Sequence, residues 1–498
     1  MCEKPNIVIV MTDQQRPDFC SHEGYPLETT PTLDGLVNSG VRFAKAYTPT
    51  PICLPARCSL FTGRFPTAHG MRSNFMGANG IRYSEDLLDV VKKHGYATGM
   101  LGKNHSHLKR EAFDFCRGYN HRRGTHRDAY REEDEKFDAF LDHLNNHYAK
   151  EPTPFDLHFQ FPVRIVQDTL DYFNAFPNQP KFAWVSFPEP HSPYQVPEPY
   201  FSMFDLDEIP ERAAGPEILG EKGFPWDWQH QLANFRVPDH VGDWRRYRAN
   251  YLGLIRLIDD QIKVLLDGLT DLGELENTHV IFLSDHGDFA GDYGLPRKGV
   301  SLPEVLTRVP MIWTGPGICA SNAGDEPCVS LVDVFSTICE LLGEEIPFGV
   351  QGRSLLPILK QENYPKREFE SIFAEYGYGG LPLTDVGEAG YFRPTSFQKN
   401  QQGDDGFDEI NDVTNAGSWK MVRKGDWKLV YMFRGKEELY NLKDDPYELN
   451  NRIDDSACIA VRDELRLELM DWMARTDETM PFNRYQMDRD AVRNHTWD

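Results

Sequence analysis

Four short apolar runs in this chain share one pattern, and that pattern restricts the possible folds more than any other feature. Each run is long enough for a buried β-strand and ends directly in polar or charged residues. Segments with helical character, such as 84–94 and 246–269, alternate with the runs. Buried strands separated by helices are typical of a mostly parallel sheet covered by helices on both faces, which is the α/β class. The four runs span residues 7–11, 97–101, 182–187 and 280–283.

The polar residues that follow these runs are predicted to lie together. In a parallel sheet the carboxyl ends of the strands meet at one edge, where folds of this class bind their ligands. One such cluster alone would be read as an ordinary loop, but four together favour a single functional site. A fifth run, 309–313, is a plausible core strand to which we assign no chemistry. The four clusters contain Asp13, Lys103 with His105, His191, and Asp285 with His286.

The chain is long enough for two domains. A single hydrophobic core does not usually grow to 498 residues. Beyond Pro357 the composition becomes polar and proline-bearing. We therefore predict a large α/β domain over residues 1–370 and a smaller α+β domain with an antiparallel sheet over residues 371–498. The smaller domain would contain a β-hairpin (419–423 and 427–431), a further strand (438–442) and an amphipathic helix (457–476).

The charge of the chain restricts its partners. A formal net charge of −24 argues against nucleic acid, because phosphate backbones are bound through clustered Lys and Arg. The same charge repels anionic substrates at long range, so a site for an anion would have to be locally basic. No apolar run approaches the ~20 residues of a membrane helix. We therefore expect a globular protein that binds neither nucleic acid nor a membrane.

The sequence also bears on the compartment. Residues 1–5 lead straight into the first apolar run, which leaves no room for the parts of a secretory signal. The nine cysteines are irregularly spaced and do not resemble a disulfide framework. The sequence as given predicts a cytoplasmic protein, or a periplasmic or secreted one if a leader was removed.

Cys53 begins the segment Cys-Leu-Pro-Ala-Arg, which ends at Arg57 and is followed by Thr-Gly-Arg at 62–64. A buried cysteine usually acts as a small hydrophobic residue, and Cys53 with Cys58 could also form a disulfide or half of a metal site. The chain has no Cys-x-x-Cys pair, and no His or Cys partner has zinc-type spacing. These alternatives stay open on this segment alone, because short patterns match by chance.

Asp13, Asp285 and His286 are the natural metal ligands at the predicted sheet edge. Carboxylates suit Ca²⁺ or Mg²⁺, whereas an imidazole widens the choice toward Mn²⁺. Asp13 could instead cap a helix, and His286 could be a hydrogen-bonded core histidine. Two potential ligands side by side at a strand end favour the metal site.

Together these segments resemble the type I sulfatases of the alkaline phosphatase-like superfamily, in the family's order along nearly the whole chain. In that family a maturation enzyme oxidises the cysteine of a Cys-x-Pro-x-Arg motif to formylglycine, an aldehyde that hydrates to a geminal diol. The resemblance implies one divalent ion, with Ca²⁺ expected and Mn²⁺ or Mg²⁺ as alternatives. The family carries Asp-Asp where this chain has Asp-Gln, which leaves the identity of the metal open. The implied metal ligands are Asp13, Gln14, the modified Cys53, Asp285 and His286.

Three further motifs carry the resemblance. The segment 95–105 resembles the signature that supplies Lys103 and His105 to the site. His191 opens a His-x-Pro-Tyr segment, and Lys298 matches the family's late lysine. These residues, with Arg57, are the implied catalytic and substrate-binding groups.

The resemblance also implies a role for each group. Arg57, Lys103, Lys298 and the metal would stabilise the negative charge of the sulfate ester, and a hydroxyl of hydrated formylglycine would attack sulfur. His191 would protonate the departing alcohol. His105 would then take the proton of the second hydroxyl, which expels sulfate and restores the aldehyde.

Two further features have competing interpretations. Asn74 could hydrogen-bond a substrate oxygen or could be an ordinary loop asparagine. A polar run after Lys103 could be a solvated face or could line a cleft for an anionic sugar chain. That run contains His107, His121, Arg122, Arg123, His126 and Arg127.

The leading hypothesis is a sulfatase that acts on a sulfated oligo- or polysaccharide, with a formylglycine-generating maturation enzyme as a partner. A second is a phosphonate monoester hydrolase or phosphodiesterase of the same superfamily, whose members share the Asp-Gln and Asp-His metal pattern. Lys103 and His105 favour sulfate, because those relatives lack that pair. A third hypothesis, of another class, is a catalytically silent protein that binds sulfated glycans and keeps Cys53 unmodified. The sequence leaves the oligomeric state unknown.

Overall fold

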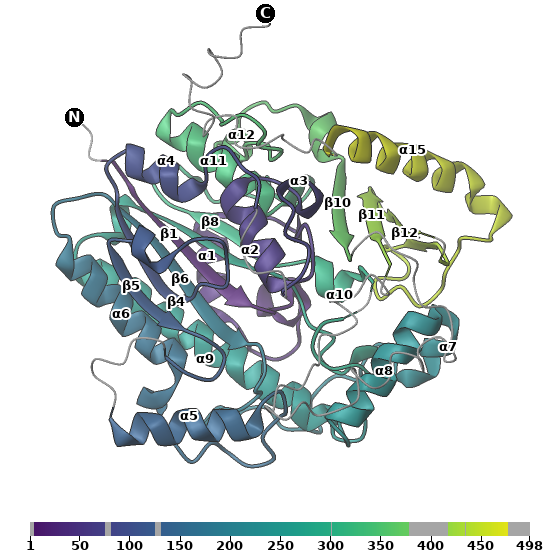
Figure 1. The fold of residues 1–498 in the computed structure, drawn as a ribbon, viewed down its shortest axis with the longest axis horizontal. Coiled ribbons are helices and arrows are strands. Elements are labelled where there is room, and N and C mark those ends of the chain that lie inside the picture. Colours follow the sequence, from purple (N-terminus) through teal and green to yellow (C-terminus); the bar gives the residue numbers. More distant parts are fainter. Residues whose placement is uncertain are drawn as a thin grey trace, which may run out of the picture.

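A computed structural model describes residues 4–74, 81–124, 131–299, 301–377, 417–433 and 435–476. Its largest feature is a seven-stranded sheet in the order β2-β8-β7-β1-β6-β4-β5 (Figure 1). The five strands from β7 to β5 are parallel, whereas β8 runs antiparallel to β7 and β2 runs antiparallel to β8. The strands are β1 (Asn6–Asp13), β2 (Val41–Arg42), β4 (Ala97–Lys103), β5 (Phe115–Tyr119), β6 (Lys181–Pro190), β7 (Thr278–Ser284) and β8 (Met311–Thr314).

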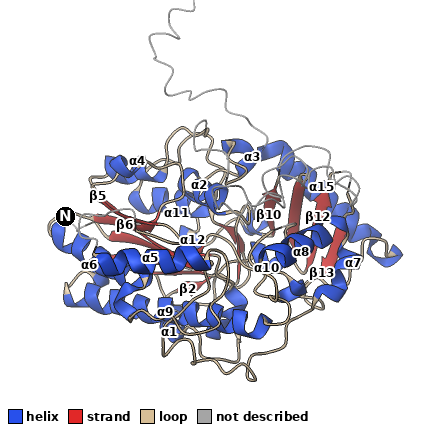
Figure 2. Ribbon diagram, turned by 60° about the horizontal axis from the view of Figure 1, so that its bottom comes forward, coloured by secondary structure: helices blue, strands red, loops and turns tan. Residues whose placement is uncertain are grey.

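Helices cover both faces of this sheet, as Figure 2 shows from the side. Alternate residues of β1 face opposite ways, so Ile7 and Met11 enter one core cluster and Val8 and Val10 enter the other. Both faces are therefore apolar, as expected for parallel strands between two helical layers. One layer consists of α2 (Cys53–Thr62), α4 (Leu87–Lys93), α11 (Val332–Leu342) and α12 (Leu356–Leu359), and the other of α1 (Pro31–Ser39), α5 (Glu132–Leu144), α6 (Phe161–Ala175) and α9 (Trp244–Asp271).

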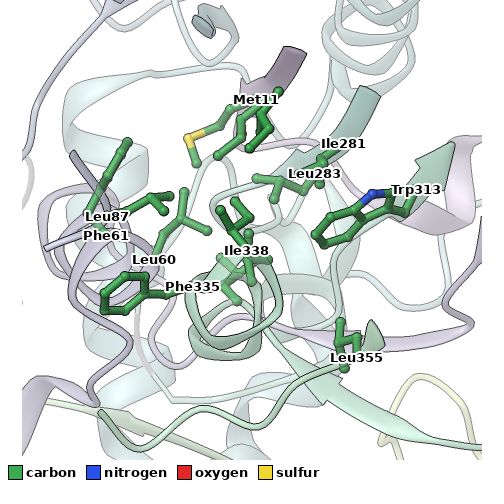
Figure 3. Packing of buried hydrophobic residues seen from close by; sticks show 14 of the residues in the cluster. Met11, Leu60, Phe61, Leu87, Ile281, Leu283, Trp313, Phe335, Ile338 and Leu355 are labelled. Atoms are coloured by element: carbon green, nitrogen blue, oxygen red, sulfur yellow. The ribbon is translucent and has the colours of Figure 1, made fainter. Parts of the chain in front are cut away.

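The first of these two cores fixes the position of α2, the helix that begins at Cys53. Leu60 and Phe61 of α2 pack against Phe335 and Ile338 of α11 (Figure 3). Met11 of β1 belongs to the same cluster and is fully buried. Helix α2 is thereby held against the sheet by its apolar residues.

A second, four-stranded antiparallel sheet lies beside the main sheet and its helices (Figure 1). It has the order β10-β11-β12-β13 and packs against α15 through a core that includes Val422, Leu469 and Trp472. The predicted C-terminal helix is formed as α15, which buries Leu465, Leu469 and Trp472 on the side of the sheet. Its exposed side also carries apolar residues, since Leu467 and Met470 are each 63% exposed. The elements are β10 (Ser371–Tyr376), β11 (Trp419–Lys424), β12 (Trp427–Met432), β13 (Glu438–Asn441) and α15 (Ile459–Thr476).

These observations confirm the predicted fold class, a mostly parallel sheet between helices with a smaller antiparallel sheet near the C-terminus. All four apolar runs are strands, and the predicted hairpin is formed by β11 and β12. The domain boundary at residue 370 stays a prediction. Within the described residues, no helix has the length and apolar character needed to cross a membrane. The remaining elements are β3 (Lys45–Tyr47), β9 (Cys328–Ser330), α3 (Pro66–His69), α7 (Leu219–Lys222), α8 (Phe224–Arg236) and α10 (Glu304–Thr307).

Candidate active site

The predicted convergence of polar residues occurs at the carboxyl edge of the main sheet. Asp13 is the last residue of β1 and Lys103 the last of β4, while Asp285 directly follows β7. Helix α2 brings Cys53 to the same place at its first turn. All four residues are buried, with at most 3% of their surface exposed.

Cys53 lies within a cluster suited to a divalent cation. One ligand atom each from Asp13, Cys53, Asp285 and His286 lies within 4.8 Å of the others. The Sγ of Cys53 is 3.1 Å from Nε2 of His286 and 3.5 Å from Oδ1 of Asp13. His286 Nδ1 lies 2.9 Å from the carbonyl oxygen of Gly287, which makes Nδ1 the donor and leaves Nε2 free to coordinate.

The charges in this cluster also fit a cation. Burial and the neighbouring Asp13 carboxylate raise the pKa of Asp285. Burial opposes ionisation of Asp13 as well, but Lys103 and His191 hold its pKa well below the usual value. Two carboxylates facing each other in a buried site require positive charge between them, which a divalent ion with oxygen and imidazole ligands supplies. The residues present therefore fit the metal that the family resemblance implies.

Gln14 is oriented by several hydrogen bonds. Its side-chain Nε2 donates to the Asp288 carboxylate and, over 3.1 Å, to the Tyr194 hydroxyl. Its Oε1 accepts from Lys298 Nζ at 3.2 Å. The backbone N–H of Gln14 donates to Oδ1 of Asp285 at 3.0 Å. The amide oxygen is thereby presented on the side of Lys298, which itself contacts Cys53.

Arg57 joins three strands at the base of the site. Its Nε donates to Oδ2 of Asp285 at 2.9 Å, and its Nη1 donates to the Lys103 carbonyl at 2.7 Å and to Ser186 Oγ at 2.8 Å. A further ion pair of 3.5 Å links Nη2 to Asp13. Arg57 lies one turn after Cys53 on α2, so the Cys-x-Pro-x-Arg spacing places both on one side of the helix.

Two lysines and a histidine surround position 53. Lys298 Nζ lies 3.3 Å from Sγ, Lys103 pairs with Asp13, and His105 hydrogen-bonds the thiol. Burial and Asp13 oppose ionisation of the thiol, but Lys103, Lys298 and His286 outweigh them and lower the pKa of Cys53 well below its usual value. Despite the chain's net charge of −24, the site is therefore locally basic, as an anionic substrate requires.

His191 and His121 form one wall of the site. Their rings stack with centroids 3.7 Å apart, and Lys103 Nζ lies 2.7 Å from His121 Nε2. The Nδ1 of His191 lies 2.8 Å from the Ser192 carbonyl oxygen, and its Nε2 is 3.5 Å from Arg297. Burial together with His121 and Lys298 lowers the pKa of His191 well below its usual value.

The other sequence candidates lie farther from the chemistry. Asn74 accepts the backbone N–H of Leu54 at 3.1 Å, at the start of α2, and its role toward substrate stays a prediction. His107 bonds Asp86, the residue that caps α4. Arg122 and Arg123 pair with Asp142 at the surface, and of the polar run only His121 among the described residues contacts Lys103. His126 and Arg127 lie outside the described residues.

Two side chains at the site were not predicted from the sequence. Asp288 is fully buried and bonds Gln14, and Arg297 is 3% exposed beside His191. Asp288 follows the predicted ligand pair by two residues, so its place in that acidic segment was a usable signal. Nothing in the sequence distinguishes Arg297 from a surface arginine.

Comparisons with known proteins show the family of this chain. The family model described as Sulfatase matches residues 5–344. The chain is 27% identical to an arylsulfatase of Clostridium perfringens, with 90% of each chain covered. It is 24% identical to an N-acetylglucosamine-6-O-sulfatase of Bacteroides thetaiotaomicron, covering 90% of this chain and 82% of that one.

Solved structures share the fold of this chain. A phosphonate monoester hydrolase of Agrobacterium radiobacter superposes with a TM-score of 0.76 at 22% identity, covering 95% of this chain and 96% of the other. That likeness shows the fold, and the family match over more than half of the chain shows the family. The site at the sheet edge thus lies in a chain that belongs to the sulfatase family of sulfuric ester hydrolases.

Proposed function

We propose that this enzyme hydrolyses a sulfate ester on a carbohydrate, with a formylglycine made from Cys53 and a divalent cation, Ca²⁺ being the expected ion. One observation carries the proposal. The Sγ of Cys53 lies between the cation-type cluster and a lysine, 3.1 Å from His286 Nε2 and 3.3 Å from Lys298 Nζ. A nucleophile at position 53 is thus next to both sources of positive charge.

The two implied groups would have distinct roles. The formylglycine would supply a hydrated aldehyde as the nucleophile, and the cation would lower the energy of negative charge in the site. Asp13, Asp285 and His286 would hold the cation, since their ligand atoms cluster with Sγ of Cys53. Gln14 would add its Oε1, which contacts the same Lys298 Nζ as that sulfur.

The fixed cations of the chain would bind the sulfate group. Lys298 contacts Sγ of Cys53, Lys103 pairs with the neighbouring Asp13, and Arg57 bonds Asp285. All three are buried and held by hydrogen bonds, so they need not reorganise as charge spreads over the sulfate oxygens. Substrate binding and stabilisation of the transition state would use the same groups.

The histidines would move the protons. Because Nδ1 of His191 donates to the Ser192 carbonyl, Nε2 is the nitrogen that can protonate a departing alcohol. A bound sulfate ester brings negative charge close to His191 and favours its protonated form. Burial and Lys103 lower the pKa of His105, which keeps this imidazole neutral and able to accept a proton beside position 53.

The carbohydrate part of the proposal is supported by the relatives. One of them is an N-acetylglucosamine-6-O-sulfatase, which matches over most of both chains. A sulfated sugar is therefore the substrate class we propose, and a formylglycine-generating enzyme is the partner that maturation requires.

A second candidate is a phosphonate monoester hydrolase. The neutral Gln14 at a ligand position favours it, since the sequence pattern Asp-Gln with Asp-His occurs in those relatives, and the fold matches one of them. Lys103 beside Asp13, together with His105 at Cys53, favours the sulfatase.

Rates with three kinds of substrate test the proposal: an aryl sulfate, an aryl phosphonate and a panel of sulfated sugars. The enzyme should first be shown to carry the modification, as a loss of about 18 Da from the peptide that contains residue 53. Cys53→Ala is the test variant, and Cys58→Ala is the control, because Cys58 is also buried on α2 but lies in a separate apolar cluster.

We expect sulfate release from a sugar that Cys53→Ala abolishes and Cys58→Ala retains. Faster turnover of the phosphonate, with no sulfated sugar accepted, would overturn the sulfatase in favour of the second candidate.

A further inference from the structure

Gln14 is the residue at which this chain departs from the sulfatase pattern, and its amide is held by a fully buried carboxylate. Gln14 Nε2 donates to Oδ2 of Asp288. The Tyr194 hydroxyl donates to the same Oδ2 at 2.6 Å and accepts from Gln14 at 3.1 Å. Gln14, Tyr194 and Asp288 all have no exposed surface.

Asp288 is itself fixed by other groups. Its Oδ1 accepts the backbone N–H of Ala290 at 2.6 Å and the Tyr247 hydroxyl at 3.2 Å. An ionised carboxylate only accepts hydrogen bonds, so it requires a donor from position 14. The NH₂ end of the amide meets that requirement, and the carbonyl end then faces Lys298.

We propose that Asp288 is a positioning residue that aims Oε1 of Gln14 at the cation and excludes a third carboxylate from position 14. The inference rests on the metal site of the proposed function and adds that positions 14 and 288 are a matched pair. An amide opposite Asp288 completes the hydrogen-bond network. A carboxylate there would have no hydrogen to donate and would place two like charges at hydrogen-bond distance.

The pairing predicts a specific rescue. Gln14→Glu conserves the length of the side chain and changes only the amide to a carboxylate. Asp288→Asn supplies an NH₂ group that can donate to that new carboxylate, which reverses the direction of the hydrogen bond. In the double variant the carboxylate at position 14 is held as the amide is now, with its second oxygen toward the cation.

Calcium binding to chelator-treated protein, measured by titration calorimetry, tests the pairing without any turnover. An added carboxylate would ordinarily tighten Ca²⁺ binding. We expect Gln14→Glu alone to bind Ca²⁺ no more tightly than the wild type. We expect the double variant to bind at least about tenfold more tightly than Gln14→Glu, the size typical of residues that orient metal ligands.

Two controls separate positioning from folding. Asp259→Asn removes a buried carboxylate of α9 that accepts the backbone N–H groups of Thr32 and Leu33 at the start of α1. The Ca²⁺ affinity of this variant should equal that of the wild type. The rise in melting temperature on adding Ca²⁺ should follow the calorimetric affinities across the variants, whereas melting in the presence of chelator reports folding alone.

Tighter binding by Gln14→Glu alone, or no gain on adding Asp288→Asn, would overturn the pairing while leaving the metal site intact. A wild type that binds neither Ca²⁺, Mn²⁺ nor Mg²⁺ would overturn both the metal site and the pairing, so the two failures are distinguishable.

Discussion

At the scale of single residues, Glu189 is a buried carboxyl group close to the site. It lies near the end of β6, is 7% exposed, and its Oε2 has no hydrogen-bond partner among the residues that the structure describes. Burial raises the pKa of Glu189 to about 8, and the charge of Asp13 adds to this effect. The neutral form is therefore the one that the fold accommodates.

This raised pKa predicts a pH-dependent stability. The folded state keeps the proton on Glu189 up to about pH 8, whereas an unfolded glutamate loses it at pH ~4.3. Between these pH values the folded state binds one more proton than the unfolded state, so raising the pH favours unfolding. The free energy of unfolding of the wild type should fall, relative to that of Glu189→Gln, by about 1.4 kcal/mol per pH unit in this window. Urea denaturation of both proteins at pH 5.5 and 7.5 measures the difference. Parallel pH profiles for the two proteins would contradict the assignment.

The residues that could be predicted from the sequence are those whose type and place both carry information. Cys53, Arg57 and Lys103 stand in motifs, and Asp285 follows an apolar run, so their convergence could be expected. Arg297 could not be predicted, because its position beside His191 depends on where the loop after β7 returns. The hydrogen bond between Gln14 and Asp288 likewise joins residues that lie 274 positions apart in the sequence.

At the scale of elements, the end of β4 shows how backbone packing aims a catalytic side chain. Gly102 has φ of +113°, and a Cβ atom there would lie 1.9 Å from the Ser186 carbonyl oxygen of β6. Only glycine fits both conditions, because the left-handed region disfavours other residues and the contact is with backbone. The next residue, Lys103, ends β4 and pairs with Asp13.

Gly102→Ala should therefore displace Lys103 and reduce kcat strongly, by about 100-fold or more for a misplaced catalytic group. Gly95→Ala is the matched control, since Gly95 also has positive φ (+79°) but no atom of the described part of the chain lies within 4 Å of the added Cβ. That control should cost about 1 kcal/mol of stability and keep its activity. Steady-state kinetics and thermal melting of both variants measure the contrast. Full activity in Gly102→Ala would show that β4 and β6 can separate without cost.

The elements themselves differ in how far the sequence predicts them. The long apolar strands were predicted within a few residues, because burial on both faces leaves a clear signal. The start of helix α2 was not predicted. Ile52 precedes the helix without a capping side chain, and Pro55 stands in its first turn. Asn74 supplies an acceptor for Leu54 N–H from 20 positions away, which no local capping signal reveals.

At the scale of the whole molecule, a buried ion-pair network joins the second sheet to the catalytic part. Lys428 of β12 has no exposed surface and pairs with Glu304 at 3.0 Å and with Glu448 at 2.9 Å. Glu304 begins α10, which follows the loop that carries Lys298. The C-terminal sheet thus contacts α10, the helix that follows the Lys298 loop along the chain.

Lys428→Met should destabilise the protein by about 3–5 kcal/mol, because it removes the ion pair of the buried Glu448 and leaves Glu304 with the longer pair to Arg423, at 3.5 Å. Lys424→Met on the neighbouring strand breaks a pair in which Lys424 and Glu464 are 29% and 57% exposed, and it should cost less than about 1 kcal/mol. Denaturant unfolding of both variants at neutral pH tests the difference. Equal effects would show that the network does not hold the second sheet to α10.

This contact between the second sheet and α10 was beyond prediction from sequence. Lysine and glutamate are usually surface residues, and only the three-dimensional arrangement shows that these are buried and paired. The net charge indicated that an anion site must be locally basic, but not where the basic groups gather.

The most direct test of the whole account is the initial rate of sulfate release from an aryl sulfate, measured on preparations with different fractions of formylglycine at position 53. The fraction is read from the mass of the peptide that contains this residue. The account predicts a rate proportional to the modified fraction and close to zero for the unmodified thiol. An unmodified preparation that releases sulfate as fast as a fully modified one would contradict it.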